Sequence, residues 1–252
     1  MCRMILLGVG TGVPDQDREN THMVWDCPDG LLLVDAGGST YQRLLRAGLD
    51  PFRLRAIVLT HSHADHINGL PALLFALKLA GFSQTLTIYG NEPTLALARR
   101  VLAAFELEQY QADARWEAVE AGREIPLWTA CFRLHTAPTV HSRPCLALRF
   151  EDTGSGRVLA YSADTEPCEA VRELARGAAV LIHEATTPGP FPGHTSPRQA
   201  GAVAAAAGVA HLVLVHFSPR WTMSAAQAIE EVRAGGFRGE VEIGRELGVY
   251  TL

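Results

Sequence analysis

The sequence predicts an α/β protein in which helices cover a parallel or mixed β-sheet. Predominantly apolar runs, typical of strands buried on both faces, occur at residues 56–59, 158–162, 179–182 and 211–215. Segments with helix signals lie between these runs, and each run ends beside a histidine or an aspartate. These three observations predict buried strands that deliver polar side chains to one edge of a sheet.

The composition is that of one large folded unit. Of 252 residues, 48% are hydrophobic and only 19% are charged, so the chain has enough apolar side chains for a substantial core. Neither a linker nor a charge run divides it, and the second half repeats the pattern of the first. We therefore expect a single domain over residues 1–252, with related halves of about 1–125 and 126–252.

Charge and apolar runs limit the kinds of partner. The net charge is −5, so no general attraction to nucleic acid is expected, although a local basic patch remains open. The first apolar run is too short for a signal peptide, and no run is long enough to span a membrane. These observations predict a soluble cytoplasmic protein.

The five cysteines are dispersed and form no Cys-x-x-Cys pair. An odd, scattered set in a chain of this length argues against a disulfide framework and against a cysteine zinc site. We therefore expect reduced, partly buried thiols at Cys2, Cys27, Cys131, Cys145 and Cys168.

The first quarter of the chain predicts a strand, a hairpin and a short helix. The glycines of residues 8–12 resemble a dinucleotide-binding fingerprint, but a loop rather than a helix follows them, so phosphate binding is not expected there. Pro28-Asp29-Gly30 is a turn signal that predicts a hairpin, and Gly48 predicts a helix end. The expected elements are strands at 1–8, 22–27 and 31–34 and a helix at 40–47.

The rest of the chain supplies further helices and short strands. Ser196 and Ser224 are each followed three residues later by glutamine, which is a capping box at a helix start, and Gly208 ends the first of these helices. The other expected elements are helices at 67–79 and 92–107, a strand at 85–89, and β-like segments at 116–119, 125–128, 132–136 and 146–150.

The densest set of metal-ligand groups is Thr-His-Ser-His-Ala-Asp-His at residues 60–66. It lies at the turn between the 56–59 run and the following helix. In such a turn His61 and His63 point the same way, whereas Asp65 and His66 turn toward a neighbouring position. A solvated polar turn is the alternative, but three imidazoles and a carboxylate so close together favour metal binding.

Further candidate site residues follow the other strands. Asp164, His183, Glu184 and His216 each come just after an aliphatic run. Ligands of layered α/β proteins bind at the carboxyl ends of strands, so this repetition predicts one site built from both halves. Asp35 also lies at a strand end. It could contact the metal ligands without binding the metal itself, or it could simply form the turn, and the two roles are equally open.

The segment His61-Ser62-His63-Ala64-Asp65-His66 resembles the H-x-H-x-D-H signature of the metallo-β-lactamase superfamily. The ordered motifs behind it resemble the ribonuclease Z (tRNase Z) branch, and the resemblance covers nearly the whole chain. These motifs are His141, Tyr-Ser-Ala-Asp-Thr at 161–165, His-Glu-Ala-Thr at 183–186, Gly-His-Thr at 193–195 and His-Phe-Ser-Pro-Arg-Trp at 216–221. The resemblance implies an αββα four-layer sandwich, two mixed β-sheets flanked by helices, with two metal ions at one edge.

The resemblance also implies roles for individual residues. Two divalent cations would lower the pKa of a shared water, giving hydroxide near neutral pH, and would clamp a phosphoryl oxygen. Asp65 would orient or deprotonate this water, and Glu184 with His194 would protonate the leaving alkoxide. The implied ligands are His61, His63 and His141 for one metal ion, Asp65, His66 and His216 for the other, and Asp164 as a bridge.

Most of these residues have a structural alternative. His183 could equally lie behind the ligands or in the core, and His22, His135 and His211 fit no motif and are expected to be structural. The alternatives are helix capping for Asp164, an ordinary loop histidine for His141, a strand-end histidine for His216, and a turn-steadying role for His194.

The implied activity is hydrolysis of a phosphodiester bond in a small or nucleotide-like substrate, by a homodimer. Neutral imidazoles suit Zn²⁺, the expected metal, with Mn²⁺ and Fe²⁺ as alternatives. True tRNA 3′ processing is one alternative activity, and hydrolysis of another ester, such as an aryl sulfate or a lactone, is a second. A metal-binding protein without turnover would require a missing ligand, and none is missing.

Two features depart from the ribonuclease Z pattern. Relatives with a tRNA-clamping arm on the same domain carry it between the positions matching His141 and Asp164, where only 22 residues occur here. That is enough for a hairpin around residues 152–156 and too little for an arm. Residues 35–42, Asp-Ala-Gly-Gly-Ser-Thr-Tyr-Gln, also differ from the family's D-C-G-E-G-T-Q. RNA binding would therefore need a local basic patch. The resemblance implies the type of reaction more firmly than it implies the substrate.

Overall fold

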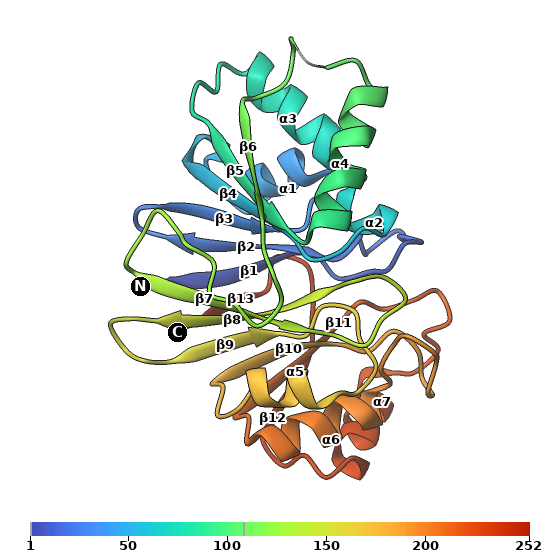
Figure 1. Ribbon diagram of the computed structural model, residues 1–252. Coiled ribbons are helices and arrows are strands. Elements are labelled where there is room, and N and C mark those ends of the chain that lie inside the picture. The colour runs from blue at the N-terminus through green and yellow to red at the C-terminus, as the bar shows by residue number, and fades with distance from the viewer. Residues whose placement is uncertain (1, 108) are drawn as a thin grey trace.

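The aliphatic runs of the sequence form the central strands of two β-sheets that face each other (Figure 1). The computed structural model describes residues 2–107 and 109–252. Within these residues one sheet has seven strands in the order β13-β1-β2-β3-β4-β5-β6, and the other has six in the order β12-β11-β10-β9-β8-β7. Met1, part of the expected first strand, lies outside the described residues.

The first sheet contains β1 (Arg3–Gly8), β2 (His22–Cys27), β3 (Gly30–Val34), β4 (Leu54–Leu59), β5 (Leu86–Gly90), β6 (Ala114–Ala118) and β13 (Val249–Thr251). The second contains β7 (Phe132–Pro138), β8 (Leu146–Asp152), β9 (Val158–Tyr161), β10 (Val180–Glu184), β11 (His211–Val215) and β12 (Glu240–Ile243).

Both sheets are mixed, and apart from β13, which pairs antiparallel with β1, both have the same sequence of pairings. In the first, β1, β2 and β3 pair antiparallel and β3 to β6 pair parallel. In the second, β7, β8 and β9 pair antiparallel and β9 to β12 pair parallel. The parallel strands therefore bring their carboxyl ends to one edge of each sheet.

Alternating side chains explain why the central strands are aliphatic throughout. In β4, Ala56 and Val58 belong to the core between the sheets, whereas Ile57 and Leu59 pack toward the helices outside the first sheet. A strand covered on both faces has no solvent side, so period-two alternation of polarity disappears. Trp25 on β2 lies fully buried between the sheets, its ring 4.9 Å from that of Phe150.

Helices cover the outer face of each sheet and complete four layers, α, β, β and α (Figure 1). The expected sandwich is confirmed. The first sheet carries α1 (Thr40–Arg46), α3 (Leu70–Leu79) and α4 (Glu92–Ala104), with a short α2 (Ala64–Ile67) and the 3-10 turn η1 (Pro51–Arg53) in the connections. The second carries α5 (Glu169–Leu174), α6 (Pro197–Ala207) and α7 (Ala225–Ala234). Both expected capping boxes, at Ser196 and Ser224, are present.

Two expected elements differ from the structure. The helix expected at 67–79 is divided at Gly69, whose N–H donates to the carbonyl oxygen of Ala36 at 2.8 Å, outside the helix. The expected strand at 125–128 does not form, since Pro126 has no N–H to donate to a neighbouring strand. The short elements η1, α2, α5, β12 and β13 were not anticipated.

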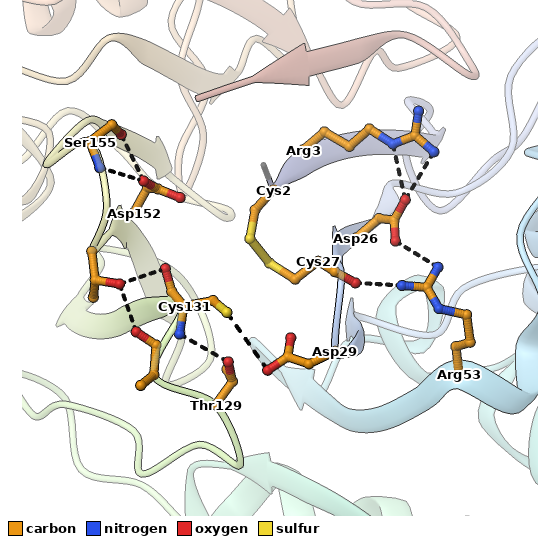
Figure 2. The surroundings of a disulfide bond; sticks show 12 residues. Cys2, Arg3, Asp26, Cys27, Asp29, Arg53, Thr129, Cys131, Asp152 and Ser155 are labelled. Carbon is orange, nitrogen blue, oxygen red and sulfur yellow. Dashed lines mark hydrogen bonds and ion pairs between the residues drawn. A yellow bond between two sulfur atoms is a disulfide. The ribbon is translucent and has the colours of Figure 1, made fainter.

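The expectation that all five cysteines are reduced is wrong for two of them. Cys2 and Cys27 form a disulfide, and their Cα atoms are 4.4 Å apart (Figure 2). Because β1 and β2 pair antiparallel with Arg3 opposite Asp26, the residues one step beyond that pair lie side by side. Their separation of 25 positions along the chain gave no sign of this. The free cysteines among the described residues are Cys131, Cys145 and Cys168.

Ion pairs also connect the segments around the disulfide. Asp26 accepts hydrogen bonds from Arg3 at 3.0 Å and from Arg53 at 2.9 Å, and Arg53 also donates to the carbonyl oxygen of Cys27 (Figure 2). No helix within residues 2–107 and 109–252 has both the length and the apolar character required to cross a membrane.

Candidate metal centre

The predicted ligands come together at the edge where the parallel strands end. His61 follows β4, while His63, Asp65 and His66 lie at the start of α2 and within it. The other members come from the second sheet: His141 from the β7–β8 loop, Asp164 from the segment after β9, and His216 from the residue after β11. Their ligand atoms form two groups that could each hold a metal ion, and a third group combines Asp164 and His216 with His194.

The first group consists of three imidazoles and one carboxylate. His63 Nδ1 lies 3.1 Å from His61 Nε2 and 3.0 Å from His141 Nε2. Asp164 Oδ2 lies 3.7 Å from the same atom of His61 and 3.8 Å from that of His141. Two ligand atoms of a tetrahedral zinc ion are roughly 3.4 Å apart, so these separations are those of a four-ligand site.

The second group shares Asp164 with the first. Asp65 Oδ2 lies 3.6 Å from His66 Nε2 and 3.6 Å from His216 Nε2. Asp164 approaches the same two imidazoles, with Oδ1 3.7 Å from His66 and Oδ2 3.5 Å from His216. The carboxylate of Asp164 therefore lies between the two groups, where a bridging ligand would be.

Hydrogen bonds behind the ligands fix the orientation of the rings. The Nδ1 of His66 lies 2.7 Å from Asp35 Oδ2, and the Nδ1 of His141 lies 2.8 Å from the carbonyl oxygen of Gly193. Because both partners are acceptors, Nδ1 carries the proton and Nε2 keeps its lone pair for the centre. Of the two roles left open for Asp35, the structure supports the one behind the ligands.

His216 is held in the same way by a hydroxyl group. Thr186 Oγ1 donates to Glu184 Oε2, so it must accept from His216 Nδ1 at 2.9 Å. Thr60 also supports the centre, since its N–H and hydroxyl both donate to Asp35. The sequence singled out neither threonine by role, although both lie inside quoted motifs.

The donor set fits a divalent cation. His66 Nε2, His216 Nε2 and Asp164 Oδ1 are buried and have no hydrogen-bond partner among the described residues. Such atoms are costly to bury unless a ligand satisfies them. Burial opposes ionisation of Asp164, but the neighbouring His216, His66 and His61 hold its pKa well below the usual value. For Asp65, burial is likewise outweighed by His216 and His66, which lower its pKa. Both carboxylates are therefore charged and suited to a metal ion.

A second constellation, Glu184 with His194, lies beside the second group. Glu184 is buried and accepts from His194 Nδ1 at 3.0 Å and from the backbone N–H of Thr165 at 2.7 Å. Burial alone would lower the pKa of His194, but the hydrogen bond and charge of Glu184 raise it above the ordinary value. The ring of His194 stacks on that of His216, with centroids 5.7 Å apart. The imidazole is thus kept ready to carry a proton next to the metal centre.

The histidines outside the motifs lie apart from both groups. His183 is buried and its Nδ1 lies 2.8 Å from the carbonyl oxygen of Glu184, so of its two open roles the core position is the one observed. His22 is buried against the carbonyl oxygen of Asn20. His135 and His211 lie near Glu124 and Glu242, respectively.

The backbone around the centre is conformationally costly at three positions. Asp35, Ala163 and His216 have φ of 60°, 49° and 65°, in the left-handed region that non-glycine residues seldom adopt. Each costs about 1–3 kcal/mol and persists only where the surroundings hold it. His216 is a proposed ligand, and Asp35 accepts a hydrogen bond from the proposed ligand His66. The strained backbone therefore orients functional side chains.

The two groups open into a cavity of about 380 Å³. Asp65, Asp164, His194 and His216 contribute to its lining, and Phe191 lines it as well. This volume is in the usual range for small-molecule sites.

A fold of two mixed sheets between helices, with two His/Asp groups at one sheet edge beside a substrate-sized cavity, defines a metal-dependent hydrolase. The family model described as a "Beta-lactamase superfamily domain" matches residues 31–217. The chain belongs to this family.

Known proteins resemble the chain over most of its length. Ribonuclease BN of Escherichia coli (strain 536) is 29% identical in an alignment that covers 86% of this chain and 90% of that protein. The metallo-beta-lactamase fold protein YhfI from Bacillus subtilis has a TM-score of 0.84 at 24% identity, covering 99% of this chain and 98% of that one. Human tRNase Z, short form, has a TM-score of 0.78 at 23% identity, with 99% and 98% covered. The resemblance to the ribonuclease Z branch is confirmed at this level.

The short connection noted in the sequence is a plain hairpin. Residues 142–163 contain β8 and β9, joined by a turn in which Asp152 accepts from Ser155. No arm extends from this part of the described chain.

Proposed function

We propose that the protein is a dinuclear phosphodiesterase of the ribonuclease Z type, acting on a small or nucleotide-like substrate. The observation that carries the proposal is the buried Glu184 hydrogen-bonded to His194 beside the second His/Asp group. Two divalent cations alone would suit many hydrolyses, whereas a poised acid is needed when the leaving group is an alkoxide. Zn²⁺ is the metal we propose, because five of the seven ligands are imidazoles.

The residues of the centre have distinct roles in this proposal. When bound, the metal pair would supply a water of lowered pKa and charge to neutralise the phosphoryl oxygens. His61, His63, His141, Asp164, Asp65, His66 and His216 would hold it. Asp65 is charged and lines the cavity, so it can orient the attacking water or accept its proton.

His194 would donate a proton to the departing oxygen. Its Nδ1–H is held by Glu184, which leaves Nε2 as the atom that can carry the transferable proton. The negative charge of Glu184 stabilises the imidazolium before the transfer. Glu184 itself is buried and would act through His194 rather than on the substrate.

The proposal is tested with bis(p-nitrophenyl) phosphate, with p-nitrophenyl phosphate, and with EDTA followed by added Zn²⁺. We expect hydrolysis of the diester in preference to the monoester, loss with EDTA and recovery with metal. Asp65→Asn should lower turnover by at least about a hundredfold with the circular dichroism spectrum unchanged, while the exposed Asp17→Asn serves as the matched control. The absence of any metal-dependent diesterase activity would overturn the proposal.

A second candidate, tRNA 3′ processing, is favoured by the names of the relatives, ribonuclease BN and tRNase Z. A net charge of −5 and the short β8–β9 hairpin argue against it. Cleavage of a precursor tRNA at moderate salt, with micromolar or tighter binding, would favour this candidate over the small substrate. Aryl sulfate and lactone substrates in the same assay test the remaining ester chemistry.

A further inference from the structure

A row of planar groups leads from the metal centre to the rim of the cavity. The ring of His194 is 5.7 Å from that of His216, with 23° between the planes, and 6.1 Å from that of Phe191, with 34° between the planes. Beyond Phe191, the guanidinium carbon of Arg220 lies 5.5 Å from the phenyl centroid. All four residues line the same cavity.

The outer pair of this row is free to meet a ligand. Phe191 is 42% exposed and lines the cavity, so part of its ring is accessible to a bound molecule. Arg220 is exposed and has no carboxylate partner among the described residues. Phe191 and Arg220 thus form a cation–π pair at the cavity mouth, with part of the phenyl ring and the guanidinium accessible and no carboxylate paired with the guanidinium in the described chain.

The loop that carries Phe191 is held in place before any ligand arrives. Prolines precede and follow Phe191, and they restrict the backbone. The N–H of His194 donates to the carbonyl oxygen of Phe191 at 3.0 Å, and the N–H of Gly193 donates to Glu166 at 2.8 Å. A ring fixed in this way loses little conformational entropy on binding, which favours its use as a contact surface.

We propose that Phe191 and Arg220 bind the nucleobase of a nucleotide substrate whose phosphate lies at the metal centre. Bases stack on aromatic rings and on guanidinium planes, and such stacking tolerates any base because every base has a flat face. One imidazole, His194, separates this pair from His216, so the base would lie one ring beyond the phosphate. The inference rests on the proposed phosphodiesterase function and narrows its substrate class to nucleotides.

The test is calorimetric titration of the metal-loaded protein with adenosine monophosphate and with methyl phosphate. The readout is the ratio of the two dissociation constants, which isolates the contribution of the base. We expect Phe191→Ala to reduce the preference for the nucleotide by about tenfold, and Phe191→Trp to retain it. Phe105→Ala is the matched control, since Phe105 is an exposed phenylalanine outside the cavity, and it should leave the ratio unchanged.

An unchanged ratio of dissociation constants in Phe191→Ala would overturn the inference. If both ligands bind more weakly by the same factor, the ratio is also unchanged, and the ring has a purely structural role. Failure of this inference is distinct from failure of the proposed function. The first leaves metal-dependent diester hydrolysis intact with no base preference, whereas the second removes diester hydrolysis whatever the binding ratio.

Discussion

His194 and His216 have nearly parallel rings, yet their Nδ1 atoms have different partners. His216 Nδ1 donates to the hydroxyl of Thr186, and His194 Nδ1 donates to the carboxylate of Glu184. The charge of Glu184 favours the imidazolium of His194, whereas Nε2 of His216 faces the carboxylates of Asp65 and Asp164, where a metal ion would replace any proton. The two histidines therefore differ both in the partner of Nδ1 and in the groups that face Nε2.

The role of His194 predicts a dependence on the leaving group. His194→Ala should slow hydrolysis of diesters with alkoxide leaving groups by about a hundredfold or more, because these need a proton on departure. Diesters of p-nitrophenol, whose anion leaves without help, should lose less than about tenfold. Steady-state rates with both substrate types are the measurement, and His135→Ala is the control. Equal losses on both types would contradict an acid role.

His22, which is not among the proposed metal ligands, predicts a pH dependence of stability. Burial lowers its pKa to about 4, against the ordinary 6.5. The neutral ring therefore contributes its full stability above pH 6.5, and this is lost as the pH falls toward 4, because the unfolded chain binds the proton first. The loss between pH 7 and pH 4 should be about 3 kcal/mol.

Urea denaturation of the metal-free protein at both pH values measures this loss. His22→Gln removes the titrating group, so the variant should lose about 3 kcal/mol less than the wild type over the same interval. The ligand histidines titrate in both proteins, and their contribution cancels in the comparison. Parallel pH profiles would show that His22 contributes nothing to the dependence.

At the scale of elements, the disulfide joins β1 to β2 at their open ends. Closing a loop of this length restricts the unfolded chain and should stabilise the fold by about 3 kcal/mol. We expect dithiothreitol to lower the free energy of unfolding of the wild type by this amount and to leave Cys2→Ala/Cys27→Ala unaffected. Urea denaturation with and without reductant is the measurement. Equal effects of reductant on both proteins would indicate that the bond is absent in solution.

Some element boundaries could be predicted from the sequence, and others could not. Capping boxes at Ser196 and Ser224 depend on residues three apart, so the helix starts were predictable. The break before α3 depends on the approach of residues 36–38 to Gly69, and the disulfide depends on strand register. Both are contacts between distant parts of the chain, and no local pattern announces them.

The candidate site divides in the same way. Residues 61–66 are nearly contiguous, so their chemistry is visible in the sequence. His141 lies in a loop without a pattern of its own and was identified through family resemblance. Asp35 stands 31 positions from the His66 that it orients, and only the fold shows that they touch.

At the scale of the whole molecule, the centre joins the two sheets and predicts a large effect of metal on stability. His61, His63, Asp65 and His66 belong to the first half, and His141, Asp164 and His216 to the second. At a free Zn²⁺ concentration about a thousand times the dissociation constant, binding should add about 4 kcal/mol to the free energy of unfolding.

Thermal unfolding with Zn²⁺ and with EDTA measures this effect. The melting temperature should fall on chelation in the wild type and in the control Asp17→Asn, whereas Asp164→Ala, which removes the shared ligand, should respond far less. A melting temperature indifferent to chelation in the wild type would contradict metal binding at this centre.

The position of β13 has a consequence for cutting and rejoining the chain. This strand comes from the end of the sequence yet pairs with β1, so the later residues complete the sheet of the earlier ones. A chain severed between β6 and β7 would yield two fragments that recognise each other through this strand and through any ion whose ligands are divided between them. The extent to which the separated fragments reassemble would then depend on the concentration of divalent metal, so the pair could serve as a split metal sensor.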